Sequence, residues 1–273
     1  MNNLNNKKIG LIAGSGQFPI IFSKIAVSKG FLVYAAAFIN EAEETLKEEV
    51  EKIEWLHLGQ VKRLVNFFKK NEIKEVVMLG AIKKTKMFSD VKPDMKAISL
   101  IMHMKSTHDD GLLSAFAGML EKEGIIVKSS TFLLPDLLAQ EGCWTKRKPT
   151  RSEKADINIG LHIAKEIGRL DIGQCVVVCG GSVLAVEAID GTDATIRRGG
   201  KLGNGEAVIV KVCKPEQDTR FDMPAVGIQT ISTMYESGVK ALAVEANKAV
   251  VFDREDMIRL ADKVGISIVA VSI

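Results

Sequence analysis

The sequence is poor in the features that mark a nucleic-acid binder. Only 5% of its 273 residues are aromatic, and 37 Lys and Arg against 34 Asp and Glu leave a net charge of +3. A nucleic-acid surface needs either a strong positive field or aromatic side chains on which bases stack. The composition offers neither, so we expect no nucleic-acid partner.

Cysteine pairs and long apolar runs are also missing. None of the four cysteines stands in a Cys-x-x-Cys spacing, and most lie in or beside strand-like apolar runs. This usage is typical of a reducing compartment rather than of a disulfide framework or a zinc site. The polar start lacks the apolar segment of a secretory signal, and no apolar run reaches membrane-spanning length. We therefore expect a cytoplasmic protein, with at most peripheral contact with the inner membrane.

The first half of the chain alternates strand-like and helix-like patterns. With 47% hydrophobic and 26% charged residues, the chain is typical of a globular protein of one large or two ordinary domains. Alternation of strands and helices predicts a parallel sheet covered by helices. We predict a Rossmann-like nucleotide-binding domain over residues 1–135. Its predicted strands are 8–13, 31–38, 75–81 and 125–129, and its predicted helices are 18–28, 61–71, 95–104 and 109–123.

The alternation breaks down over residues 136–152, which we interpret as a linker. This stretch contains Gly142, Pro149 and a basic cluster of Lys146, Arg147 and Lys148. Such a cluster is typical of a solvated linker, and contact with anionic lipid headgroups is the alternative.

Residues 153–273 predict a mixed α/β domain, which we interpret as the catalytic one. Gly180-Gly181 and Asp190-Gly191 separate short apolar runs and indicate hairpin turns in a meander. The predicted strands are 176–178, 183–189, 194–196, 207–212, 241–245, 249–252 and 266–271, and the predicted helices are 152–169, 231–237 and 254–264.

A glycine turn, Gly14-Ser15-Gly16-Gln17, follows the first predicted strand. Glycines at such a turn let the backbone approach a phosphate, and the helix that follows presents free N–H groups. The third position of the dinucleotide fingerprint is Pro19, which disfavours a nucleotide-dependent oxidoreductase. Nucleotide binding without hydride transfer is our interpretation, and a purely structural turn is the alternative.

Several other polar residues admit both a functional and a structural interpretation. Lys83 follows the third predicted strand, at the edge where open sheets bind ligands, but is equally consistent with a solvated surface. Thr107 and Asp110 have the spacing of a helix capping box, so they need no catalytic role. Glu187 and Glu245 stand in apolar strands, where each either faces solvent or lines a site.

Residues 214–224 hold the densest cluster of reactive groups, with Lys214, Asp218, Arg220 and Asp222 directly after an apolar strand. In an extended segment the last three share one face, because side chains alternate. Asp218 and Asp222 would then lie about 13 Å apart, too far to ligate one small metal unless the chain turns. An anion such as phosphate, approached by Arg220 and Lys214, fits this cluster better.

Motifs from both halves, in order, resemble the LpxI-type UDP-2,3-diacylglucosamine pyrophosphatases along essentially the whole chain. Asp190 is the single departure that we notice, and it keeps the charge of the motif. The motifs are Leu11–Pro19, Thr107–Asp110, Gln174–Val178, Val186–Asp193, Lys214–Asp218, Arg220–Pro224 and Val244-Glu245.

The resemblance implies hydrolysis of the pyrophosphate in a glycolipid nucleotide of lipid A biosynthesis in a Gram-negative bacterium. Water attacks the α-phosphorus in that family, giving UMP and 2,3-diacylglucosamine 1-phosphate (lipid X), with Mg²⁺ (or Mn²⁺). It also implies two domains facing a substrate cleft, a homodimer, and an essential aspartate that corresponds to Asp222. A nucleotide-binding or regulatory module without turnover is the alternative.

These expectations give each candidate residue a role. Asp222 orients or deprotonates the attacking water, or contacts the metal, with Asp218 as a second metal contact. Arg220 and Lys214 neutralise phosphate oxygens. The predicted substrate-binding residues are Gly14, Ser15, Gly16, Gln17, Lys83, Thr107, Asp110, Thr192 and Asp193.

Overall fold

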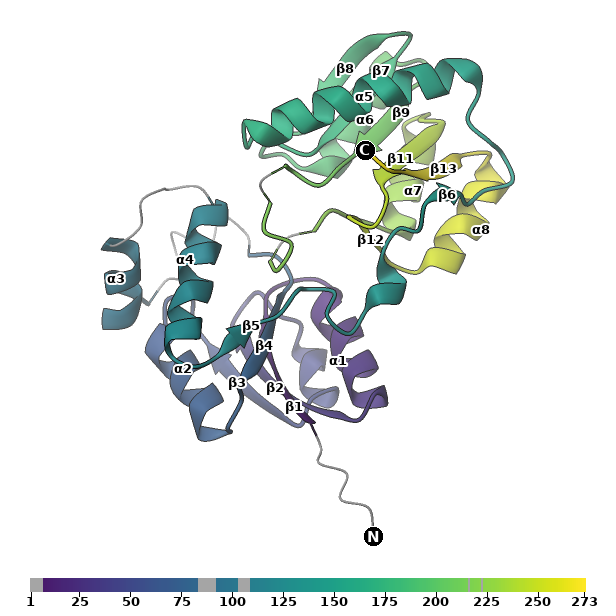
Figure 1. The fold of residues 1–273 in the computed structure, drawn as a ribbon. Coiled ribbons are helices and arrows are strands. Elements are labelled where there is room, and N and C mark those ends of the chain that lie inside the picture. The colour runs from purple at the N-terminus through teal and green to yellow at the C-terminus, as the bar shows by residue number, and fades with distance from the viewer. Residues whose placement is uncertain (1–6, 83–91, 103–108, 216, 222) are drawn as a thin grey trace. The chain divides into compact units, whose positions relative to one another are not determined.

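The chain folds into two compact units (Figure 1). The computed structural model describes residues 7–82, 92–102, 109–215, 217–221 and 223–273. The first unit comprises Met1–Pro135 together with Asp218–Asp222, and the second comprises Asp136–Gln217 and Met223–Ile273. Five residues from the second half of the sequence therefore belong to the first unit.

The first unit is built on a parallel sheet with strand order β3-β2-β1-β4-β5. This order is that of one nucleotide-binding half and the start of the next in doubly wound folds, which confirms the predicted Rossmann-like class. One of its strands, β3, is not among those predicted from the sequence. The strands are β1 (Lys7–Ala13), β2 (Phe31–Phe38), β3 (Lys52–Leu56), β4 (Glu75–Leu79) and β5 (Ile126–Val127).

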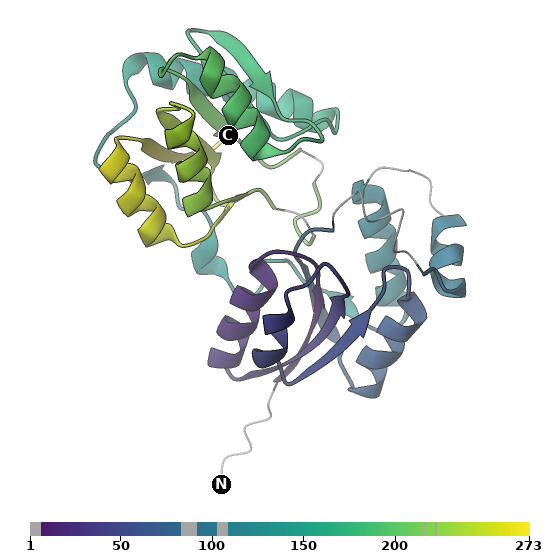
Figure 2. The same ribbon diagram turned by 180° about the vertical axis from the view of Figure 1, so that it is seen from behind.

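Helices cover both faces of this sheet (Figures 1 and 2). One face carries α2, α3 and α4, whose apolar residues form a single core cluster with Ile12, Ala36 and Met78 of the strands. The other face carries α1. The helices are α1 (Phe18–Ser28), α2 (Val61–Lys70), α3 (Met95–Met102) and α4 (Asp109–Lys122), with a 3₁₀ turn η1 (Glu44–Glu48) after β2.

The second unit contains a mixed sheet with strand order β6-β13-β11-β9-β7-β8. The pairs among β13, β11 and β9 are parallel, and the remaining pairs are antiparallel. The predicted mixed α/β class is confirmed. The strands are β6 (Gly142–Cys143), β7 (Cys175–Cys179), β8 (Ser182–Val186), β9 (Val208–Lys211), β11 (Ala241–Glu245) and β13 (Ser267–Val271); β10 (Ala225–Val226) and β12 (Val250–Val251) form a separate parallel pair.

Alternate residues of these strands face different helices. Val176 and Val178 pack with residues of α5, whereas Val177 and Ile209 pack in the cluster that includes α6, α7 and α8 residues. Both sets are fully buried, as expected for strands covered on both faces. The helices are α5 (Arg151–Arg169), α6 (Thr192–Leu202), α7 (Ile228–Glu236) and α8 (Arg254–Val264).

The predicted strand at 194–196 is wrong, because these residues lie in α6. Gly199 and Gly200 within this helix make the sequence look unlike a helix. Both are required by packing: a Cβ at Gly199 would lie 2.4 Å from Val177 Cβ, and one at Gly200 2.3 Å from the Ser237 carbonyl oxygen. Close contact with neighbouring elements thus overrides the low helix propensity of glycine.

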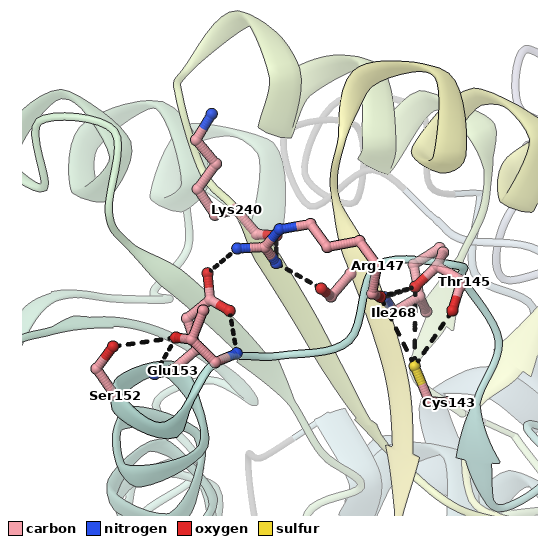
Figure 3. Close-up of polar contacts among 9 residues, drawn as sticks. Cys143, Thr145, Arg147, Ser152, Glu153, Lys240 and Ile268 are labelled. Carbon is pink, nitrogen blue, oxygen red and sulfur yellow. Dashed lines mark hydrogen bonds and ion pairs between the residues drawn. The ribbon is translucent and has the colours of Figure 1, made fainter.

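Residues 136–152, where the sequence predicts a linker, contribute ordered structure to the second unit. A 3₁₀ turn, η2 (Pro135–Leu137), is followed by β6, which pairs with β13. Figure 3 shows Arg147 donating to the Lys240 carbonyl and to Glu153, and it also donates to Ser267. Thr150 and Glu153 cap the start of α5 reciprocally. Arg147 therefore ties this segment to the sheet and is not simply solvated.

Candidate functional site

The glycine turn after β1 is held against the end of β4. The N–H of Gly14 donates to the Leu79 carbonyl at 2.8 Å, and both the N–H and the hydroxyl of Ser15 donate to the Ala81 carbonyl, at 2.8 and 2.7 Å. A Cβ at Gly14 would lie 2.6 Å from the Ala81 oxygen, so only glycine fits. The structure therefore gives Gly14 and Ser15 a structural explanation.

The remaining part of the turn, Gly16 and Gln17, leads directly into α1. Gly16 has φ +92°, with no atom within 4 Å of the position of a Cβ. Gln17 is the N-cap residue of α1 without a side-chain capping bond, and proline occupies the first helical turn. The phosphate contact predicted for the Gly14–Gln17 turn stays a prediction, and a helix start of this kind would offer the N–H groups of Gly16 and Gln17 to it.

The described residues of the segment 213–217, which leave out Glu216, are held by the second unit. The Lys214 ammonium lies 2.6 Å from Asp171, and the Gln217 side chain accepts hydrogen bonds from the Lys214 N–H and the Cys213 thiol. The Gln217 N–H also donates to the Lys214 carbonyl. The segment after β9 is therefore a compact turn, and Lys214 is already paired with an acid.

Residues 218–221 form another turn, which is part of the first unit. The Phe221 N–H donates to the Asp218 carbonyl at 3.0 Å, so the chain turns here and the distance considered for an extended segment does not apply. The Asp218 carboxylate accepts from the Arg220 backbone N–H at 3.0 Å and from its guanidinium at 2.7 to 3.0 Å. These local hydrogen bonds compete with the extended form, as aspartate side chains commonly do at turns.

Three further contacts attach this turn to the first unit. Arg220 Nη1 lies 2.9 Å from Glu121 of α4, the Ser130 hydroxyl donates to the Thr219 carbonyl, and Phe221 packs against the apolar cluster of α2, α3 and α4. The guanidinium is thus shared between two carboxylates. Arg220, which the sequence predicts as a cation for phosphate, is engaged by these two carboxylates and holds the turn in place.

The contact between Arg220 and Asp218 also shifts the pKa of each side chain. Hydrogen bonding from Arg220 lowers the pKa of Asp218, and the bond to Asp218 raises the pKa of Arg220. Asp218 is therefore an ionised acceptor with occupied oxygens, which is unfavourable for the expected second metal contact. Within the described ranges, no group of three His, Cys, Asp or Glu side chains could hold a metal ion.

Three predicted site residues, Lys83, Thr107 and Asp222, lie outside the described residues. Asp110 is placed in the first turn of α4, without a described side chain. The predicted catalytic aspartate therefore belongs to a segment whose preceding residues, 218–221, are anchored to the first unit.

Glu245, at the end of β11, fixes the base of the 213–217 turn. Its side chain is 2% exposed and lies 2.7 Å from Lys165, 3.0 Å from Lys248 and 3.0 Å from the Cys213 N–H. Burial raises the pKa of this carboxyl, but the hydrogen bonds outweigh burial, and the pKa is lowered. Glu245 is thus a buried anchor and not a residue on a solvated face.

Glu187 plays a similar part at the start of α6. It is buried, accepts a 2.6 Å hydrogen bond from the Thr192 hydroxyl, and accepts another from the Gln174 N–H at 3.1 Å. Asp193 follows in the first turn of the helix, where an acid complements the helix dipole. Local structure thus accounts for Thr192 and Asp193, and their predicted contact with substrate stays a prediction.

Comparison with known proteins covers both units. The family LpxI N-terminal domain matches residues 8–137, and the family LpxI C-terminal domain matches residues 140–269. A relative, the UDP-2,3-diacylglucosamine pyrophosphatase LpxI of Caulobacter vibrioides, is 32% identical over 97% of this chain and 98% of its own. This chain belongs to the LpxI family. The resemblance inferred from the motifs is confirmed.

Solved structures add little to the LpxI assignment. The biotin carboxylase domain of Hydrogenobacter thermophilus 2-oxoglutarate carboxylase gives a TM-score of 0.27 at 10% identity, over 64% of this chain and 35% of that one. The biotin carboxylase subunit of pyruvate carboxylase gives 0.27 and 10%, over 67% and 38%. This chain thus spans little more than a third of either structure, and a likeness this low carries no argument.

Glu121 and Ser130 are two residues of this LpxI chain that the sequence did not single out. They hold the 218–221 turn, yet Glu121 stands 99 residues before Arg220. Each also has an ordinary local appearance, one near the end of a helix and the other just after a strand. No local signal in the sequence could have connected them to the cluster.

Proposed function

We propose that this chain hydrolyses the pyrophosphate bond of UDP-2,3-diacylglucosamine, giving UMP and 2,3-diacylglucosamine 1-phosphate in lipid A biosynthesis. The observation that carries the proposal is the 32% identity, over 97% of the chain, to a relative named for this activity. The fold supports it, because the first unit has the strand order of nucleotide-binding sheets.

The proposed reaction is a direct displacement by water. The water oxygen bonds to the α-phosphorus, the bond from that phosphorus to the bridging oxygen breaks, and the bridging oxygen leaves on the sugar phosphate. The water proton passes to the Asp222 carboxylate, which acts as the general base. A base of this kind contributes roughly 10²- to 10⁴-fold in rate.

Positioning is the second requirement of phosphoryl transfer, because the protein forms no covalent bond to phosphorus. We assign this role to Arg220, which is bonded to Asp218 within the turn and to Glu121 on α4. The turn that it holds directly precedes Asp222 in the sequence. Arg220 is in this view a positioning residue rather than a direct phosphate ligand.

Of the two aspartates predicted to contact Mg²⁺, we retain only Asp222. Asp218 accepts hydrogen bonds on both oxygens, so Asp222 together with substrate phosphate oxygens would hold the ion, as is common for Mg²⁺. The ion would neutralise charge on the phosphates.

The test is to incubate the protein with UDP-2,3-diacylglucosamine in ¹⁸O-labelled water and to measure UMP. We expect Mg²⁺-dependent, chelator-sensitive release of UMP that carries the label. Asp222→Asn should reduce kcat by about 10²-fold or more while nucleotide binding persists. Asp256→Asn, at an exposed position of α8, is the matched control and should keep full activity. Absence of UMP from the wild-type protein would leave the alternative, binding without turnover.

The homodimer and the peripheral membrane contact remain proposals. No helix among the described residues is long and apolar enough to cross a membrane. Sedimentation with vesicles of inner-membrane lipids tests the contact, and light scattering of the purified protein tests the dimer.

A further inference from the structure

The first unit contains an apolar cavity of about 260 Å³. Its floor is formed by the buried side chains of Ile12, Leu64, Met78 and Ala97. Its rim includes Leu113 and other half-buried apolar side chains of α4. Apolar side chains left partly in water at a rim favour an apolar occupant.

The lining is almost free of hydrogen-bonding groups. Among the described residues that line it, Gln60 has the one polar side chain, and its oxygen already accepts from the His57 N–H at 2.9 Å. Water in such a space would find too few polar partners. This described lining therefore favours a hydrocarbon chain over a polar head group.

Residues that line the cavity adjoin two polar segments of the first unit. Ile12 lies two residues before Gly14, and Ile82 follows Ala81, whose carbonyl accepts from Ser15. On another side, Leu113 and Phe116 line the cavity and share an apolar cluster with Phe221 of the 218–221 turn. All of these residues belong to the first unit, so their arrangement does not depend on the second.

We propose that this cavity binds one of the two acyl chains of the substrate, and thereby selects chain length. The inference rests on the proposed function, which supplies a ligand with acyl chains next to a pyrophosphate. A volume of about 260 Å³ lies just below the range of about 300–1,000 Å³ found for ligand pockets, which suits part of a single chain.

The expected signature is a steep dependence of substrate recognition on chain length. Each additional buried methylene should raise kcat/KM about fourfold until the cavity is full, because transfer of a methylene from water is favourable by this factor. Beyond that length the gain should stop. Synthetic UDP-2,3-diacylglucosamines with acyl chains of increasing length provide the series.

Ala97→Phe is the decisive variant, since it places a ring in the floor of the cavity. We expect it to shorten the preferred chain and to reduce kcat/KM for the longest substrate at least tenfold, with the shortest substrate unaffected. Ile98→Phe, on the same helix at a side chain 40% exposed, is the matched control and should keep the wild-type preference. Leu113→Ala, which widens the rim, should shift the preference toward longer chains.

Equilibrium binding separates this inference from the proposed function. Calorimetry with 2,3-diacylglucosamine 1-phosphates of different chain lengths reports on the cavity even if the protein releases no UMP. A failure of turnover with chain-length-dependent binding would overturn the function and keep the cavity. A flat chain-length profile in the wild-type protein, or one that neither Ala97→Phe nor Leu113→Ala changes, would overturn the inference. If Ala97→Phe does not fold, Leu113→Ala alone decides.

Discussion

At the residue scale, Arg220 shows how contacts decide between two roles for one side chain. Its sequence context suggested a phosphate ligand, but its guanidinium is bonded to Asp218 and Glu121. An arginine with a planar, fixed fork of donors is well suited to holding two carboxylates at defined angles. The consequence is that disturbing Arg220 should displace the turn rather than remove a charge from the phosphates.

Two variants distinguish the positioning role from direct phosphate binding. Arg220→Ala should reduce kcat about 10²-fold with little change in KM, because a small displacement of catalytic groups costs about this much. Glu121→Gln should change kcat in the same direction by a smaller factor. Steady-state kinetics with UDP-2,3-diacylglucosamine give both constants.

The control for this pair is Arg259→Ala, which removes an exposed arginine paired with Asp256 on α8. It should leave both constants unchanged. A lower KM in Glu121→Gln, with kcat intact, would mean that the carboxylate restrains a phosphate-binding guanidinium, and would contradict the positioning role.

Glu41 is a second residue with an unusual environment. It follows β2 in the first unit, is 6% exposed, and neither carboxylate oxygen has a hydrogen-bond partner in the described structure. A buried polar group without a partner costs roughly 1–3 kcal/mol.

Glu41→Met should therefore increase the free energy of unfolding by about 1–3 kcal/mol in urea denaturation. Glu44→Met, at an exposed position nearby, should change it by less than about 0.5 kcal/mol. A destabilised Glu41→Met protein would show that the carboxylate has an energetic role.

At the element scale, the sequence predicted best those elements that have a simple apolar pattern. Buried strands such as β1 and β2, and helices such as α8, appear close to their predicted bounds. The misses have physical causes. In α6 the two glycines are needed because Val177 and Ser237 lie too close for a side chain at these positions, and the sequence does not show these contacts. The edge strand β3 has a charged and aromatic composition that is only half-buried.

The glycine turn allows a test at this scale of which glycine serves the fold. Gly14→Ala should lower the free energy of unfolding by about 1–3 kcal/mol, since its Cβ would meet the Ala81 carbonyl oxygen at 2.6 Å. Gly16→Ala should cost about 1–2 kcal/mol through its φ of +92° alone. Chemical denaturation measures both.

Enzyme kinetics should also distinguish Gly16→Ala from Gly14→Ala. If the Gly16 N–H contacts the nucleotide phosphate, Gly16→Ala should raise KM severalfold. Gly118→Ala, in α4 with open space around the glycine, is the control and should not destabilise the protein. Equal effects of Gly14→Ala and Gly118→Ala on stability would contradict the close approach of β1 and β4.

Glu245 connects β11, α5 and the 213–217 turn, so its ionisation should affect stability. Its pKa lies below the ordinary value of 4.5 in the folded protein. A depressed carboxyl pKa stabilises the fold fully above the unfolded value, and this contribution is lost as pH falls through the folded value. The wild-type protein should therefore lose stability from about pH 4.5 downward, and Glu245→Gln should show a smaller loss over this range.

Glu245→Gln should also be less stable than the wild-type protein at pH 7, because it removes the buried carboxylate that pairs with Lys165. The expected loss is about 3 kcal/mol, measured by urea denaturation. Glu166→Gln, which removes an exposed pair with Arg169, should lose less than about 0.5 kcal/mol. An identical pH dependence in Glu245→Gln and wild type would contradict the assigned role.

At the scale of the whole molecule, the sequence predicted a cluster of candidate residues but not how the structure divides that cluster between the two units. The sequence brought Lys214, Asp218 and Arg220 into one cluster because they are neighbours in the chain. The structure divides them, since Lys214 is paired with Asp171 in the second unit and Arg220 with Glu121 in the first. Contacts between residues far apart in sequence determine this division, and local pattern carries no information about them.

This division predicts how the molecule unfolds. The chain passes from the second unit into the first at Asp218 and returns after Asp222, so the first unit cannot unfold without releasing a segment that is covalently continuous with the second. We expect one calorimetric transition for the wild-type protein. The double variant Arg220→Ala/Phe221→Ala removes the ion pairs and the half-buried ring that hold the segment, at a cost of about 2–3 kcal/mol. It should show two transitions, the lower one about 5–10 °C below that of the wild type.

The two transitions should be assignable to the units. Amide hydrogen exchange below the first transition should show lost protection in β1, β2 and β4, with β9 and β11 still protected. Asp171→Ala is the matched control: it removes the partner of Lys214 in the second unit and leaves the 218–221 turn intact. It should keep a single transition. One transition in the double variant, at the wild-type temperature, would contradict this prediction, because the contacts of residues 218–221 with α4 and its apolar cluster would then contribute nothing to cooperativity.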